Sequence, residues 1–304
     1  MARRRPYDEM VSTPTDSDFL EARPRLFGIA YRMLGSATEA EDVVQEVWLR
    51  WQQADRSDVR EPAAFLATIA TRLSINAATT ARARHETYIG PWLPDPVDTS
   101  ADPSLGAERG EALELAVLLL LERLTPSERA AYVLREAFDY PYPLIAEIVQ
   151  QAEPTVRKSV SRAKEHLATE RKAPVSQPEH RRLLNAFLAA ARIGDVGALE
   201  KLLSTDVVSF TDGGGVRQAA RIPVLGRERV AQFVGAFAGH FWTGASIHEV
   251  VINGATGFAL RRDDETFALL SITASESGID QLLWMMNPQK ISTVTVTEAN
   301  PALS

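Results

Sequence analysis

The sequence predicts a multidomain chain in which two all-α domains are followed by an α+β domain. Two blocks carry apolar residues at helical spacing, one before about residue 85 and one from about residue 107 to 172. Segments rich in proline, serine and aspartate separate the blocks, as is typical of linkers. After residue 178, two helical patterns precede five short strand-like runs, the order expected of an α+β domain.

The composition is that of an ordinary soluble globular protein, with 45% apolar and 24% charged residues among 304. The chain has no cysteine, which excludes disulfides and thiolate metal sites and fits a reducing cytoplasm. It has no apolar run of about 18 residues, which a membrane span needs, and no apolar core behind its N-terminal arginines. We therefore expect a cytoplasmic protein with no membrane association. The net charge of −7 gives no sign of nucleic-acid binding. A nucleic-acid-binding surface therefore has to be sought in the local distribution of charge.

The first block contains three predicted helices. The buried face of the first helix is formed by Leu26, Ile29, Ala30 and Met33. The apolar stripe of the second helix is formed by Ala40, Val44, Val47 and Trp51. Its opposite face is acidic and carries Glu39, Asp42 and Glu46. The third helix begins after Pro62 and ends in the polar segment TTARARHE.

The second helical block ends in a short helix, a tight break and a longer basic helix. The short helix follows Pro143, and the longer one starts at Pro154. From Pro154 to Lys172, six lysines and arginines oppose two glutamates, which leaves a local charge of +4. This layout is typical of a DNA-binding helix-turn-helix. Gln150 stands in the turn where glycine is common, and because a non-glycine residue tolerates left-handed φ poorly, we expect a slightly reshaped turn.

The last block opens with two helical patterns, at 181–194 and 196–203. The strand-like runs that follow are VVSFT, IHEVVIN, GFALRR, TFALLSITA and QLLWMM. We expect these runs to form a curved antiparallel sheet that folds around the helices. Such a sheet usually leaves a pocket between itself and the helices.

Three motifs in order resemble a known family. RPRLFGIAYRMLGSATEAEDVVQEVWLRW is similar to region two of an extracytoplasmic-function (ECF) sigma factor, and LTPSERAAYVLREAFDYPYPLIAEIV with VRKSVSRAKEHL is similar to its region four. The linker YIGPWLPDP, TDGGG at 211–215 and NPQKI at 287–291 resemble a subgroup with a C-terminal SnoaL-like domain of the nuclear-transport-factor-like cone fold. The resemblance implies sigma region two at 1–87, a linker at 88–106, sigma region four at 107–173 and the SnoaL-like domain at 178–304.

By this resemblance the chain is a promoter-specificity subunit of RNA polymerase, with no enzyme activity, cofactor or metal of its own. Its partners would be promoter DNA and core RNA polymerase, at the clamp of the largest subunit. Charges on a helix face are often merely solvated, but the resemblance makes the acidic face of the second helix the clamp-docking surface. The implied clamp-docking residues are Glu39, Asp42 and Glu46.

The resemblance also implies two DNA-reading surfaces. The candidates for reading and melting the −10 element are Arg72, Asn76, Arg82 and Arg84, behind a specificity loop at 55–61. The candidates for the −35 element lie at the start of the basic helix and are Thr155, Arg157, Lys158, Ser161 and Arg162. Ala77, Thr79 and Thr80 stand where the family often has basic residues, so we expect fewer phosphate contacts there.

The C-terminal domain permits other interpretations. Asp212, His240 and His248 suggest acid–base chemistry, but no spaced acid and base pair emerges, and we expect no catalysis. The DGGGV loop differs from the family's usual DGGGK, with Arg217 one place later. A one-component helix-turn-helix regulator with a ligand-sensing C-terminal domain remains an alternative function. Whether the C-terminal pocket binds an unknown small molecule also stays open.

The segment IGPWLPDP predicts an interdomain contact. Its prolines reduce the entropy lost when the segment is ordered, and its tryptophan and leucine supply an apolar anchor. We expect this linker to dock on the SnoaL-like domain and to hold the free protein compact, in place of a separate anti-sigma factor. The residues expected at the contact are Pro91, Trp92, Leu93, Pro94, Asp212, Gly213, Gly214, Gly215, Asn287 and Pro288.

Overall fold

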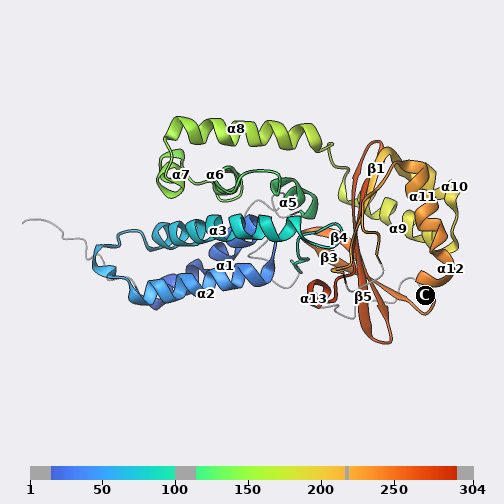
Figure 1. Cartoon of the computed structure of the whole chain (residues 1–304), viewed down its shortest axis with the longest axis horizontal. Helices are drawn as coiled ribbons and strands as arrows, with labels where there is room; N and C mark the ends of the chain where they lie inside the picture. The colour runs from blue at the N-terminus through green and yellow to red at the C-terminus, as the bar shows by residue number, and fades with distance from the viewer. Residues whose placement is uncertain (1–14, 100–113, 216–218, 293–304) are drawn as a thin grey trace, which may run out of the picture.

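The computed structural model describes residues 15–99, 114–215 and 219–292. Within these ranges a helical part and a sheet domain lie side by side (Figure 1). This arrangement agrees with the predicted order of two helical domains and a mixed domain. Predicted residues and boundaries in 1–14, 100–113, 216–218 and 293–304, including Arg217, lie outside the description.

The N-terminal helices form a bundle around the apolar faces that their spacing predicts. They are α1 (Asp16–Leu34), α2 (Ala37–Gln53) and α3 (Pro62–Glu86), with a 3₁₀ turn at Arg56–Asp58 between the last two. Leu26, Ile29 and Met33 are fully buried on α1, and Val47 and Trp51 on α2. Gly35 ends α1 in the left-handed conformation with φ 65°, which glycine adopts without strain.

The next helices are α5 (Leu115–Leu121), α6 (Pro126–Glu136), α7 (Tyr142–Val149) and α8 (Glu153–Glu170). A capping box of Thr125 and Glu128 starts α6. Gln150 ends α7 with φ 55° and ψ 46°. The expectation of a reshaped turn was therefore wrong: Gln150 takes the left-handed conformation itself, at a cost of roughly 1–2 kcal/mol.

The two helical units share one apolar core. Buried residues of α1–α3 and of α5–α8 belong to a single cluster, and α3 contacts both α6 and α7. The two units that resemble regions two and four are thus packed against each other (Figure 1).

In its described residues, the C-terminal domain combines five helices with a six-stranded sheet. Its helices are α9 (Gln177–Ile193), α10 (Val196–Leu202), α11 (Arg227–Ala236), α12 (Ala238–Phe241) and α13 (Pro288–Ile291). Its strands are β1 (Leu203–Asp212), β2 (Val224–Leu225), β3 (Ser246–Ile252), β4 (Ala255–Arg262), β5 (Glu265–Ser275) and β6 (Gly278–Met285). The sheet order is β2-β1-β6-β5-β4-β3.

The sheet is mixed rather than antiparallel, which corrects the sequence-based expectation. The pair β1 and β6 is parallel, with Phe210 opposite Leu283, and the other neighbouring pairs are antiparallel. Helices between β1 and the later strands allow the parallel pairing, because such a connection must cross over the sheet.

Both faces of this sheet are buried. Phe258, Leu270 and Leu282 face the core under α9–α11. Their neighbours Ala259, Leu269 and Leu283 belong to a separate cluster on the opposite face. Successive side chains of a strand point to opposite faces. The second cluster therefore lies on the other face of the sheet, where Leu93 of the linker and Leu115 of α5 cover it.

Candidate interdomain site and nucleic-acid interface

The linker lies between the α1–α2 turn and the sheet domain. The backbone N–H of Asp95 donates to the carbonyl of Gly35 at 2.7 Å, on the helical side. The N–H of Leu93 donates to Asp212 Oδ2 at 3.0 Å, and the N–H of Val97 donates to Asn253 Oδ1 at 2.9 Å, both in the sheet domain. Alternate parts of one short segment therefore bind two different domains.

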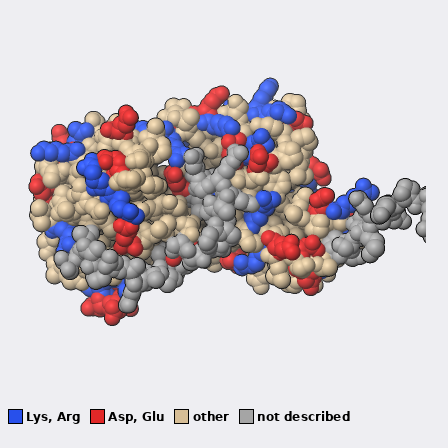
Figure 2. All heavy atoms as spheres, turned by 180° about the vertical axis from the view of Figure 1, so that it is seen from behind, with Lys and Arg blue, Asp and Glu red and all other residues tan. Residues whose placement is uncertain are grey.

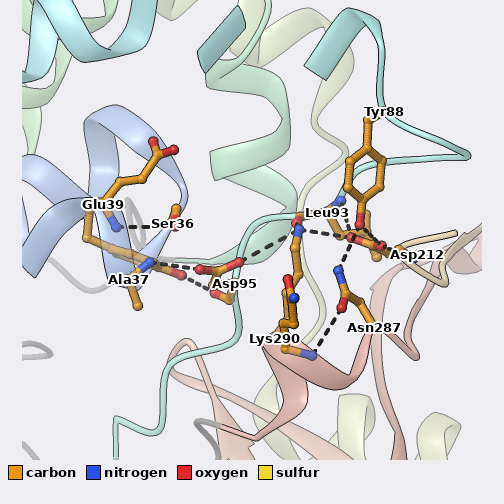
Figure 3. Close-up of polar contacts among 12 residues, drawn as sticks. Ser36, Ala37, Glu39, Tyr88, Leu93, Asp95, Asp212, Asn287 and Lys290 are labelled. Carbon is orange, nitrogen blue, oxygen red and sulfur yellow. Dashed lines mark hydrogen bonds and ion pairs between the residues drawn. The ribbon is translucent and has the colours of Figure 1, made fainter. Parts of the chain in front are cut away.

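Asp212, at the end of β1, is the centre of the sheet-domain contact (Figure 3). Its carboxylate is fully buried. It accepts hydrogen bonds from Tyr88 Oη at 2.5 Å, Lys290 Nζ at 2.9 Å and the Gly214 N–H at 3.1 Å, besides that of Leu93. A buried carboxylate is tolerated when it is paired and hydrogen-bonded in this way.

Lys290 joins α13 to the linker. The residue is 8% exposed, and its ammonium donates to the carbonyl of Leu93 as well as to Asp212. It lies 3.7 Å from Asp95 Oδ1 and 4.4 Å from the centre of the Trp92 ring. A cation over an aromatic face is attracted by the ring, so this one side chain holds the linker by charge, hydrogen bond and ring contact.

Tyr88 completes the network from the end of α3. Burial, followed by the hydrogen bond to Asp212, raises the pKa of Tyr88 above its usual value. The phenol therefore keeps its proton and donates to Asp212, while it accepts from Asn287 Nδ2 at 2.9 Å. Asn287 also begins α13 by accepting from the Gln289 N–H at 3.1 Å.

Glycines allow the close approaches at this site. A Cβ on Gly214, whose φ is 62°, would lie 2.5 Å from Asn287 Cγ. A Cβ on Gly35 would lie 2.6 Å from the Trp92 ring. Both positions also have the positive φ that L-residues rarely adopt, so larger residues there would displace the contacts.

The remaining predicted contact residues surround this network. Leu93 is 1% exposed and lies in the apolar cluster on the sheet face, with Leu115 of α5 and Ile291 of α13. Pro91 is half-buried, Pro94 and Gly213 are buried, Gly215 is exposed beside Ile89, and Pro288 is the first residue of α13.

A second contact ties the sheet domain to α1. Tyr31 Oη donates to the carbonyl of Asp95 at 2.5 Å and accepts from Asn253 Nδ2 at 2.7 Å. Tyr31 is fully buried, and this burial raises its pKa. The N–H of Ala37 donates to Asp95 Oδ2 at 2.9 Å (Figure 3). The linker thus has a partner surface on the helical part, which the sequence analysis did not predict.

The predicted acidic residues lie along α2, which begins at this contact. Glu39 and Glu46 are half-buried and Asp42 is exposed. Glu46 pairs with Arg50 at 2.8 Å, and the carboxylate of Glu39 points away from the linker (Figure 3). These residues share one surface of α2, opposite the buried Val44 and Val47.

The predicted −10 residues lie along α3 but differ in whether their side chains are bonded to other parts of the protein. Asn76 is exposed. Arg72 instead donates to the carbonyls of Glu147 and Ile148, at 3.0 and 3.1 Å, at the C-terminal end of α7. Cations near a helix C-terminus are stabilised by the exposed carbonyls. Arg82 and Arg84 belong to α3, but their side chains lie outside the description.

The predicted −35 residues are all exposed on α8. Arg157 is held by Glu153 at 2.6 Å and lies 4.2 Å above the Tyr142 ring. Arg162 is 3.5 Å from Glu128. Basic side chains project at the upper edge of the molecule (Figure 2), the edge along which α8 runs in Figure 1. The spacing of Thr155, Lys158 and Ser161 puts them on this exposed surface.

The structure does not assemble a catalytic group from Asp212, His240 and His248. The four donors to Asp212 include neither histidine. His248 contacts Ser246 at 3.2 Å, and His240 lies on α12. Within the described ranges, no group of three or more His, Asp or Glu side chains is placed to hold a metal ion, and no described helix is long and apolar enough to cross a bilayer.

Sequence reasoning missed several residues of the site, namely Tyr31, Tyr88, Asp95, Asn253 and Lys290. Lys290 and Asp95 stood inside the quoted NPQKI and IGPWLPDP motifs. Tyr88 was the first residue of the quoted YIGPWLPDP, and Tyr31 stood inside the quoted RPRLFGIAYRMLG. The signal for Asn253 was weaker, because Asn253–Gly254 is only a typical turn pair between two strands.

Comparisons with known proteins extend over the helical part and beyond it. The family model "Sigma-70 region 2" matches residues 19–84, and "Sigma-70, region 4" matches residues 114–167. The ECF RNA polymerase sigma factor SigJ of Mycobacterium tuberculosis (strain ATCC 25618 / H37Rv) is 35% identical over 224 residues, which cover 72% of this chain and 71% of the relative. The probable ECF RNA polymerase sigma factor SigI of Mycobacterium tuberculosis (strain CDC 1551 / Oshkosh) is 32% identical, covering 71% of this chain and 74% of the relative.

The fold is also similar to a solved structure. The crystal structure of the Mycobacterium tuberculosis extracytoplasmic function sigma factor SigJ matches with a TM-score of 0.74 and 28% identity. The match covers 93% of this chain and 100% of that chain, so it includes the sheet domain. A one-component regulator would not explain the region 2 match, and the comparisons do not favour that alternative.

Proposed function

The chain belongs to the extracytoplasmic-function RNA polymerase sigma factors, and on this premise we propose that its SnoaL-like sheet domain regulates it in cis by holding the linker. The free protein is then a closed state, and core polymerase binds the open one. The linker contact takes the place of a separate anti-sigma factor. The sheet domain catalyses no reaction in this account.

Sigma factors bind core RNA polymerase and promoter DNA. We assign the polymerase contact of this chain to the acidic surface of α2, with Glu39, Asp42 and Glu46 facing the clamp of the largest subunit. We assign −10 recognition to α3 and −35 recognition to the exposed N-terminal half of α8. The exposure of Asp42 supports the polymerase assignment, and the exposure of the α8 residues supports the −35 assignment.

The observation that carries the proposal is the set of contacts that the sheet domain makes with Leu93 of the linker. Leu93 is bound through both its N–H and its carbonyl, by Asp212 and Lys290, and its side chain is buried on the sheet. The same segment is bound to the turn at Gly35. Because both domains hold one short segment, the linker cannot extend while either contact persists.

The packing of the two DNA-reading units supports a closed state. A sigma factor has to span the −35 and −10 elements, yet the two units here share one apolar core. Arg72, a candidate for −10 contact, is bonded to the end of α7 in the helix-turn-helix. Opening would release this arginine and lengthen the reach between α3 and α8.

Trp92→Ala tests the proposal. The ring bridges the two sides, because it lies against Gly35 and under Lys290. Its removal should increase the radius of gyration in small-angle scattering and tighten binding to core polymerase, since less free energy opposes opening. Each 1.4 kcal/mol of lost linker contact corresponds to about tenfold in affinity.

The matched control is Ile193→Ala, which truncates a side chain that is 78% exposed in the same sheet domain. It should leave both scattering and polymerase affinity unchanged. If Trp92→Ala has the same compactness and the same polymerase affinity as the wild type, the linker is only a spacer and the proposal fails.

A further inference from the structure

The sheet domain contains a cavity to which neither Asp212 nor Lys290 contributes a lining residue. Its volume is about 700 Å³, within the range of about 300–1,000 Å³ typical of small-molecule sites. Five aromatic side chains contribute to its lining, namely Phe233, Phe237, Phe241, Trp242 and Trp284. The cavity is therefore large enough, and apolar enough, for a ligand with one or two rings.

The aromatic wall is held in place by its own ring contacts. The ring of Phe241 lies 5.0 Å from that of Trp242 and 5.7 Å from that of Trp284, both at edge-to-face angles. Phe187 of the domain core also contacts Trp284, with the ring centres 6.3 Å apart. Edge-to-face pairs of this kind are favourable, so the wall does not depend on a ligand for its shape.

The charge of the lining favours an anion. Arg221 lines the cavity, and none of its described lining residues is an aspartate or a glutamate. Thr211 adds a hydroxyl. An arginine pairs well with a carboxylate, because its guanidinium presents donors that match the two oxygens. The acidic Asp212 next to Thr211 does not offset this charge, because Lys290 is bound to it.

Exposed apolar side chains gather at the cavity. Ile89 and Phe237 line it and are 59% and 39% exposed, and Ile222, next to Arg221, is 74% exposed. Single exposed apolar residues are ordinary, but an exposed apolar group rimmed by polar residues is typical of a binding site. A ring-bearing ligand would cover part of this surface.

One wall of the cavity is the linker itself. Ile89 and Gly90 line it directly, four and three residues before the Leu93 contact. Gly90 has φ 93°, and a Cβ there would lie 3.8 Å from Arg221 Cα. The wall is complete only while the linker is docked, so a ligand that touches it binds the docked state more tightly.

We propose that this cavity binds a small aromatic carboxylate, with the ring against Phe241, Trp242 and Trp284 and the carboxylate at Arg221, and that binding strengthens linker docking. The regulatory half rests on the function proposed above. A ligand shifts an equilibrium only by its differential affinity for the two states. Here that difference comes from Ile89 and Gly90, which undocking would remove.

Calorimetric titration of the full chain with 2-naphthoate, and with the neutral 2-naphthalenemethanol, tests the binding. The wild type should bind 2-naphthoate saturably. Ala220→Trp should abolish binding, because the new side chain fills the cavity that Ala220 lines. Arg221→Gln should weaken 2-naphthoate about fivefold, the size of a partly exposed ion pair, and leave the neutral probe unchanged.

The control is Arg229→Gln, an exposed arginine of α11 that does not line the cavity, and it should bind both probes as the wild type does. Absence of saturable 2-naphthoate binding by the wild type, or wild-type binding by Ala220→Trp, would overturn the site. Equal loss of both probes in Arg221→Gln would overturn the preference for an anion.

The coupling has its own readout. Saturating 2-naphthoate should slow hydrogen exchange at the amides of Leu93 and Asp95 and weaken binding of the full chain to core polymerase. Saturable binding with unchanged exchange and affinity would overturn the coupling alone. The Trp92→Ala experiment needs no ligand. If the cavity binds no 2-naphthoate, the proposed cis-regulation is unaffected, and if Trp92→Ala behaves as the wild type, the binding site is unaffected.

Discussion

Leu93→Ala removes the apolar anchor of the linker without touching either charge at the site. The side chain is 1% exposed and lies among Leu115, Ile252 and Leu283, on the face of the sheet that meets the helical part. Its backbone N–H and carbonyl, which bind Asp212 and Lys290, are kept in alanine. The substitution therefore separates the contribution of the buried leucine side chain from that of the backbone hydrogen bonds to Asp212 and Lys290.

The expected loss follows from burial. Truncating a fully buried leucine to alanine costs about 2–5 kcal/mol, depending on how far the cavity collapses. A linker can relax more than a helix core, which favours about 3 kcal/mol within that range. Because 1.4 kcal/mol corresponds to tenfold, this loss lowers the docking equilibrium by about 150-fold.

Hydrogen exchange reads this equilibrium directly. The amides of Asp95 and Val97 are bonded to Gly35 and Asn253, on opposite sides of the linker. Their protection reports the free energy of local opening and should fall by about two orders of magnitude in Leu93→Ala, in line with the truncation cost. Amides in the middle of β5 and α1 should keep their protection.

Leu225→Ala is the control, because that leucine of β2 is 57% exposed. It should change no linker amide. Two results would refute the reasoning: wild-type protection of Asp95 and Val97 in Leu93→Ala, or an equal loss throughout β5, which would mean that the domain unfolds rather than releases the linker.

Three further predictions concern the polymerase, the promoter and pH. Reversing Asp42 and Glu46 to lysine should sharply reduce co-purification with core polymerase at nearly unchanged thermal stability, because Asp42 is exposed and a surface ion pair such as Glu46–Arg50 contributes little to folding; undiminished co-purification would exclude this surface. Arg157→Ala should cost about 1–3 kcal/mol in promoter binding and relax the preference at one −35 position if the arginine reads a base; wild-type transcription from every −35 variant would show that α8 is not the reader. Tyr31→Phe should lower the free energy of unfolding at neutral pH by about 1–2 kcal/mol, because it removes the buried hydrogen bonds of the phenol to Asp95 and Asn253. Since burial raises the pKa of Tyr31 above 10.0, the wild type should lose stability as the pH rises beyond that value and the variant should lose less, which chemical denaturation at neutral and alkaline pH measures.

The helical part was largely predictable because its spacing is unambiguous. The predicted buried faces of α1 and α2 are buried, and α8 carries Val156, Val160 and Leu167 on its inner face. Family resemblance then supplied the function, which the sigma-factor comparisons confirm. Gln150 shows the limit of a propensity argument: the turn geometry outweighed the preference for glycine.

The sheet and the site were predicted less completely. The strand runs were recognised, but FALLSI and QLLWMM are apolar on both faces, and that is the mark of a sheet covered on both sides. Read in this way, they would have indicated the cluster of Leu269, Leu283 and Met285 beneath the linker. The parallel pairing of β1 with β6 has no local signal, because register depends on partners far apart in sequence.

Arg72 illustrates why site residues cannot be assigned from sequence alone. Its position on α3 predicted contact with DNA, whereas its guanidinium is bonded to α7 in this structure. In the proposed cis-regulation, this side chain binds α7 in the closed state and DNA in the open state, and only the three-dimensional packing reveals the bond to α7. The role of Lys290 could not be predicted either, since nothing in the sequence NPQKI indicates that its lysine is only 8% exposed.

The distance between α3 and the helix-turn-helix, in the free protein and on core polymerase, tests the central claim most directly. The chain has no cysteine, so Thr79→Cys and Gln151→Cys, both at exposed positions, give two unique sites for spin labels. Double electron–electron resonance should show one short distance in the free protein and a longer one when core polymerase is bound. The same short distance in both states would contradict a closed form that polymerase opens.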